Sequence, residues 1–309
     1  MSRKEKTGPP KELNIRVTGN KSGTGNATAR DDITSSHTHI GKPPTPPPHT
    51  YIFPMIRTLI IISASGLVLF QKSFVNAVSQ PRLIGSLLTA MIEFSSKVAG
   101  IPLAYIELLG CGVSVVTNDV AKVNCALFYD LEDGPEFGKL IATEILLAFS
   151  DAYSADLGGI ARDLNQFQDF QYTISSVIRN SVRPVLLALH SERGIQAAVL
   201  VTDQATYTIK EIDQIGVQAN LHALVGAATD VLTAGDLEDA PTQIFIDTGE
   251  AKTRLVVWKL QGVGATYLVV RVSKVAKMQE KVRVAIDKAL TMLRKVCALS
   301  LSLHASSLS

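Results

Sequence analysis

The chain has 309 residues, of which 46% are hydrophobic and 19% are charged, and its formal net charge is +2. This length favours two domains, and the hydrophobic content is sufficient for two buried cores. The charge is nearly balanced and no aromatic residues alternate with the basic ones, which argues against a nucleic-acid-binding protein.

Residues 1–54 are predicted to be a disordered, proline-rich leader. They are rich in Lys, Gly, Ser, Thr and Pro, so burial of apolar groups cannot offset the entropy cost of ordering them. They contain no apolar core of signal-peptide length, and their acidic residues argue against a transit peptide. We therefore expect a cytoplasmic protein, in which the leader is either a solvated tail or a segment ahead of an alternative start at Met55.

Residues 55–180 predict a first α/β module. The apolar run that begins it is too short to cross a bilayer and contains Arg57, so it predicts a hairpin of two strands, Arg57–Ser63 and Leu67–Val75. Pro81 then opens a helix whose apolar residues follow helical spacing and are expected to cover one face of a sheet. Three strands and a second helix complete the order, and their expected ranges are Leu103–Leu109, Gly112–Thr117, Lys122–Tyr129 and about 135–157.

Residues 181–300 repeat this order of elements. A short helix from Pro184 to Ser191 is followed by a hairpin, a helix, three strands and a closing helix of about residues 277–299. Residues 301–309 are expected to form a C-terminal tail. The predicted fold class is therefore α/β (α+β), with two tandem modules that each contain a five-stranded antiparallel sheet in ββαβββα order.

No metal, cofactor or catalytic site is expected. The cysteines lack CxxC spacing and lie in apolar stretches, which predicts buried, unreactive thiols, a redox or metal role being the alternative; they are Cys111, Cys125 and Cys297. The glycine-rich segment 19–25 lacks the spacing of a phosphate-binding loop, and the GxSxG and HExxH motifs are absent. Arg183 and Arg193 are candidates for an arginine finger, but arginines beside a helix are usually structural. We expect a protein that is not an enzyme.

Basic residues recur on the closing helix at positions that lie along one stripe, namely Lys277, Lys281, Lys288 and Lys295. The simpler interpretation is a solvated face that keeps an apolar helix soluble. The alternative is a contact with an anionic membrane surface or an acidic partner.

The order of elements carries a resemblance to two related families. Residues 55–180, which open with the apolar segment Met55–Ile61, resemble a longin domain. Residues 182–299, with their short first helix and the strand after Gly194, resemble a roadblock/LC7 domain. The resemblance implies an adaptor that binds a small GTPase, or another longin or roadblock protein, in the cytoplasm and at the periphery of endomembranes. The alternative is a structural subunit of a vesicle coat, tether or dynein-type motor complex.

Members of these families pair through edge strands, so the third strands of the two modules, Leu103–Leu109 and Gln243–Asp247, are expected to pair with each other or with a partner. Apolar residues are unusual on a solvent-facing edge strand, and they mark an edge that invites a partner. The residues expected to form the interface are Tyr105, Ile106, Leu108, Ile244 and Phe245.

Overall fold

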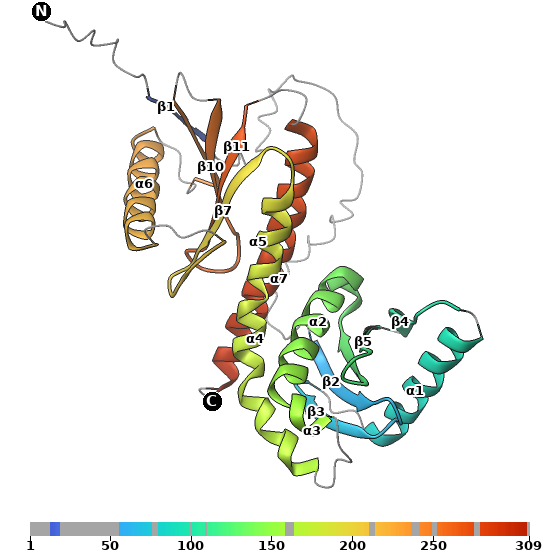
Figure 1. Cartoon of the computed structure of the whole chain (residues 1–309). Helices are drawn as coiled ribbons and strands as arrows, with labels where there is room; N and C mark the ends of the chain where they lie inside the picture. The colour runs from blue at the N-terminus through green and yellow to red at the C-terminus, as the bar shows by residue number, and fades with distance from the viewer. Residues whose placement is uncertain are drawn as a thin grey trace, which may run out of the picture.

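The computed structural model describes residues 13–18, 56–75, 80–98, 100–108, 110–157, 164–209, 214–235, 241–248, 252–274 and 279–307. These residues form two antiparallel sheets that follow one another along the chain, each with its own helices (Figure 1). The predicted fold class is confirmed, because both modules contain a five-stranded antiparallel sheet in the expected ββαβββα order.

The first module has the strand order β3-β2-β6-β5-β4. Its strands are β2 (Ile56–Ser63), β3 (Val68–Ser73), β4 (Tyr105–Leu108), β5 (Cys111–Asn118) and β6 (Val123–Tyr129). Helix α1 (Pro81–Lys97) covers one face of the sheet and α2 (Gly134–Ala152) covers the other. Successive residues of a strand point to opposite faces, so Ile60 belongs to the α1 side and Ile61 to the α2 side. This two-sided burial explains why β2 is apolar at consecutive positions.

Helix α2 approaches the sheet most closely at Gly138. A Cβ atom added there would lie 2.0 Å from Cε1 of Tyr129 and 2.6 Å from Oγ of Ser114. The hydroxyl groups of Tyr129 and Ser114 are themselves hydrogen-bonded at 2.9 Å and buried. Only a residue without a side chain fits between the helix and this pair.

A helical connector joins the modules. It consists of α3 (Ser154–Leu157), the 3-10 segment η2 (Leu164–Tyr172), α4 (Ile174–Asn180) and α5 (Val182–Ser191). Phe170 anchors η2 on the first module, since its ring packs edge-on against Phe70 at 5.4 Å and Phe149 at 5.1 Å. Pro184 lies in the first turn of α5, where a missing N–H is tolerated.

The second module has the five predicted strands β7 (Ile195–Val201), β8 (Thr206–Thr208), β9 (Gln243–Thr248), β10 (Thr253–Lys259) and β11 (Tyr267–Ser273). Helix α6 (Gln214–Ala234) packs on one face, through residues such as Leu221 and Ala228. Helices α5 and α7 (Gln279–Ser307) cover the other face. Each sheet is therefore buried on both sides, which matches the high hydrophobic content.

Helix α7 connects the two modules. Its 29 residues make it about 43 Å long at ~1.5 Å per residue, and it packs along α5 and α4 toward the first module (Figure 1). Residues of α2, α4, α5 and α7 belong to one continuous buried cluster. The predicted tail at 301–309 is wrong as far as Ser307, since α7 continues to that residue and Arg179 Nη2 lies 2.8 Å from His304 Nε2.

The leader contains a strand that composition did not indicate. Leu13–Thr18 forms β1, which pairs antiparallel with β9 and adds a sixth strand to the second sheet. The alternation of Leu13, Ile15 and Val17 with polar residues is the local pattern of a strand, but it was outweighed by the polar composition around it. The prediction of a leader without secondary structure is therefore wrong for this segment. The rest of residues 1–54 lies outside the described residues.

Candidate functional site

Strand β4 provides an open edge in the first module. It pairs with β5 on one side and is the last strand in the sheet order of the described residues. Of the three residues expected at this edge, Leu108 is exposed, whereas Tyr105 and Ile106 are half-buried. Ile106 packs against the cluster on the α1 side of the sheet, so its side chain contributes to the core as well as to the edge.

Helix α1, on the same module, carries an apolar stripe that faces solvent, and the strands it mainly contacts are β2 and β3. We call Leu83, Leu87, Phe94 and Val98 the α1 stripe; each is between 60% and 70% exposed. At ~3.6 residues per turn these positions fall within roughly 60° of arc around the helix axis. The adjacent face of α1 packs on the sheet through Ile84, Leu88 and Ile92. The helix therefore has one buried apolar face and a second, exposed one.

The α1 stripe was not anticipated, because the sequence pattern had assigned all apolar residues of this helix to one buried face. A signal was present in the sequence. The helix has adjacent apolar pairs at 83–84, 87–88 and 91–92, which makes its apolar surface wider than one sheet face covers. Pairs of this kind indicate two neighbouring stripes, of which the sheet buries one.

The corresponding edge of the second module is closed. Strand β9 is paired with β10 on one side and with β1 on the other. Ile244 is only 2% exposed, and Phe245 is half-buried with the guanidinium carbon of Arg254 lying 5.4 Å from its ring centroid. The expectation that the third strands of the two modules pair with each other is therefore wrong for the described residues, and β1 occupies the edge at which Ile244 and Phe245 were expected to meet a partner.

The lysines of α7 do not form one outward patch. Lys288 Nζ lies 3.0 Å from Glu136 Oε1, and Lys295 Nζ lies 2.6 Å from the backbone oxygen of Asp133. These contacts place two of the four predicted residues between α7 and the start of α2. Lys281 is exposed. Lys277 lies outside the described residues.

Asp133 is the buried acidic group of this contact. Its carboxyl group is 8% exposed and lies 3.9 Å from Lys295 Nζ. Burial raises the pKa of Asp133 to about 6, and the charge of Lys295 opposes that shift. The turn that contains Asp133 is docked against α7.

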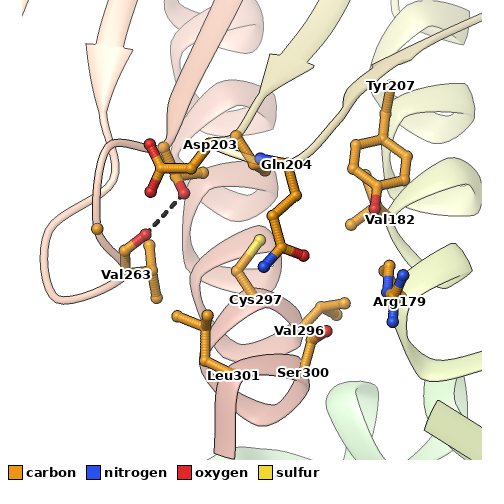
Figure 2. Close-up of a pocket in the computed structure, with 13 residues that line it drawn as sticks. Arg179, Val182, Asp203, Gln204, Tyr207, Val263, Val296, Cys297, Ser300 and Leu301 are labelled. Atoms are coloured by element: carbon orange, nitrogen blue, oxygen red, sulfur yellow. Dashed lines mark hydrogen bonds between the residues drawn. The ribbon is translucent and has the colours of Figure 1, made fainter. Parts of the chain in front are cut away.

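A small cavity lies between α4, the β7–β8 turn, the β10–β11 turn and α7 (Figure 2). Gln204 and Cys297 point into the same space, and the ring of Tyr207 extends toward Val182 and Arg179 (Figure 2). The volume is about 90 Å³, well below the ~300 Å³ or more of sites for drug-sized ligands and cofactors. Burial raises the pKa of the Cys297 thiol to about 12, so it is not a nucleophile near neutral pH.

A more open hollow of about 480 Å³ lies along the second sheet beside the start of α7. Its apolar lining includes Phe245 and Trp258. The charged residues near it are paired with one another, since Asp247 accepts hydrogen bonds from Arg254 and lies 3.2 Å from Lys274 Nζ. The hydrogen bond from Arg254 lowers the pKa of Asp247. This hollow therefore offers apolar surface more than unpaired charge.

Comparison with protein-family models and with curated protein sequences gave no match. Among the described residues, no helix has the length and apolarity needed to cross a membrane. The same residues contain no group of three His, Cys, Asp or Glu side chains arranged to hold a metal ion. All three cysteines are buried and free, as the sequence predicted, and burial raises the pKa of Cys125 and Cys297.

Proposed function

We propose that this chain is a non-enzymatic adaptor that binds a small GTPase through its first module, in trafficking or signalling at endomembranes. The observation that carries the proposal is the α1 stripe, which lies on the same module as the open edge of β4. An exposed apolar surface and an unpaired strand edge are the two features that most often mark a protein-binding face.

The α1 stripe is large enough to dominate an interface. Full burial of one large aliphatic or aromatic side chain contributes about 1.5–3 kcal/mol, and the stripe has four such side chains that are each more than half exposed. Strand β4 adds backbone donors and acceptors that a partner strand can pair with. Together they suit a partner that presents a strand edge or an apolar groove.

A small GTPase is proposed as the partner because of the order of elements. Two modules in ββαβββα order, the second preceded by a short helix, resemble a longin domain followed by a roadblock domain. In those families the modules serve as platforms for small GTPases.

The second candidate is a structural subunit of a vesicle coat, tether or dynein-type motor complex. It is favoured by the composition of the α1 stripe, which is purely apolar. Permanent interfaces are more hydrophobic than transient ones, and a partner that must dissociate more often uses a polar rim.

The test is retention of purified small GTPases, loaded with GDP or with a non-hydrolysable GTP analogue, on the immobilised full chain. We expect one GTPase to be retained in one nucleotide state, and Leu87→Glu to abolish that retention. The matched control is Val231→Glu. It places the same charge on α6 of the second module, at an apolar side chain that is 66% exposed. Retention of no GTPase in either state, or equal loss with both variants, would contradict the proposal.

A further inference from the structure

The second sheet contains a strand that comes from a distant part of the chain. Leu13–Thr18 pairs with all six residues of β9, from Leu13 opposite Thr248 to Thr18 opposite Gln243. Residues 19–55 separate β1 from the first strand of the first module. The strand is last in the sheet order, so β9 is its neighbour on one side and the described residues provide none on the other.

The register brings like residue types together. In an antiparallel pair, residues directly opposite one another lie on the same face of the sheet. Ile15 and Val17 occupy positions opposite Ile246 and Ile244, both of which belong to the apolar cluster under α6. Asn14 is opposite Asp247, on the other face. The pairing therefore matches aliphatic positions to the buried side of the sheet, and a shift by one residue would reverse this match.

Strand β9 lacks the features that usually protect an edge. It contains no proline and no lysine, its centre is Ile244-Phe245-Ile246, and its ladder with β10 shows no bulge. An edge of this kind is a template for a further strand. In the first module the corresponding strand, β4, has only four residues and no added strand among the described residues.

We propose that the outer edge of β9 is a binding site for an extended peptide segment with aliphatic residues at alternate positions, and that the chain's own Leu13–Thr18 fills it reversibly. Main-chain hydrogen bonds supply affinity in strand addition, and alternate side chains supply the preference for one pattern. A strand held at one edge by six residues, and attached through a long linker, is easier to exchange than a central strand. Attachment to the same chain raises the local concentration of β1 above that of a free peptide, so the site is closed in the free chain and opens when β1 is weakened.

The test uses the full chain and a fluorescently labelled synthetic peptide that covers residues 11–20. In the variant Ile15→Lys/Val17→Lys, lysines replace the two aliphatic positions of β1 and the edge of β9 should become free. We expect the peptide to bind this variant, measured by fluorescence anisotropy, at least about tenfold more tightly than the wild-type chain, because tethered β1 competes in the latter. The matched control is Asn14→Lys/Arg16→Lys, which changes the alternate positions of the same strand and should leave the edge closed.

Any one of the following results would overturn the proposal. The peptide binds neither chain, or it binds wild type and variant equally, or the same peptide with lysine at both aliphatic positions binds as well. If analytical ultracentrifugation shows a dimeric wild-type chain and a monomeric Ile15→Lys/Val17→Lys variant, the proposal is also overturned, because β1 would then come from a second copy.

Amide hydrogen exchange keeps the inference testable if the variant is less stable. In the wild-type chain the amides of β9 should be protected on both sides of the strand. In the variant we expect those facing β1 to exchange faster, while β10 and β7 keep their protection. Loss of protection throughout the second sheet would show that β1 is an integral strand and not a replaceable one.

Discussion

Substitution of Gly138 by Ala tests the closest contact in the first module. An Ala Cβ would lie 2.0 Å from the ring of Tyr129, whereas non-bonded carbons pack at about 3.5–4 Å. Either α2 moves away from the sheet or the Tyr129 ring rotates and breaks its buried hydrogen bond to Ser114. Overpacking of this kind costs about 1–3 kcal/mol, and a buried group left without its partner costs about 1–3 kcal/mol more.

Helix propensity acts in the opposite direction. Ala is more favourable than Gly in a helix interior by up to about 1 kcal/mol, so we expect a net loss of roughly 2–4 kcal/mol in the free energy of unfolding. Gly226 provides the control, because it lies within α6 and an added Cβ would meet no atom within 4 Å. Gly226→Ala should therefore stabilise the protein by up to about 1 kcal/mol.

The assay is equilibrium unfolding in urea, followed by circular dichroism and by the fluorescence of Trp258. Trp258 lies in the second module, but α7 and the shared buried cluster connect the modules, so we expect both signals to shift together for Gly138→Ala. A Gly138→Ala protein as stable as wild type would refute the close approach of α2 to the sheet. A shift in circular dichroism without a shift in fluorescence would refute the coupling of the modules.

Two further predictions concern the contact between α7 and the start of α2. The pKa of Asp133 is about 6 in the folded state and 3.8 for an ordinary Asp. The folded state therefore binds more protons than the unfolded state between these two values, and the free energy of unfolding should fall as pH rises from about 4 to about 6. Asp133→Asn should raise the free energy of unfolding by up to about 3 kcal/mol near neutral pH and by less at about pH 5, as measured by thermal unfolding. A loss of stability at neutral pH would instead show that the ionised pair of Asp133 and Lys295 is favourable. By contrast, Lys288→Glu alters an exposed pair with Glu136 and should cost less than about 1 kcal/mol in the same assay. A larger loss would show that this ion pair holds the modules together.

Much of the fold could be predicted from the sequence because its elements have strong local signals. Consecutive apolar residues in β2, the turns between strands and Pro81 at the start of α1 each fix one element independently of the rest. The repeated order then determines the class. Long-range packing is not encoded in this way, and it was there that the predictions were wrong.

The lysines of α7 show why candidate sites were harder to predict. Helical spacing correctly indicated that Lys288 and Lys295 share a face, but spacing contains no information about what packs against that face. Both lysines contact the acidic turn at the start of α2, more than one hundred residues earlier in the chain. Strand β1 was missed for the related reason that its partner, β9, is distant in sequence and the residues around it are polar.

The two modules share one order of elements and yet present different surfaces, and this difference decides where a partner is expected. In the second module β1 covers the edge strand, and α6 buries Leu221, Ala228 and Leu232. In the first module no described strand pairs with the outer side of β4, and α1 exposes Leu87 and Phe94. Helix α7 packs against α4 and α5, and its buried residues share one cluster with those of α2 in the first module. Occupation of one surface and exchange of β1 at the other therefore involve different modules, and each can be tested without altering the residues of the other.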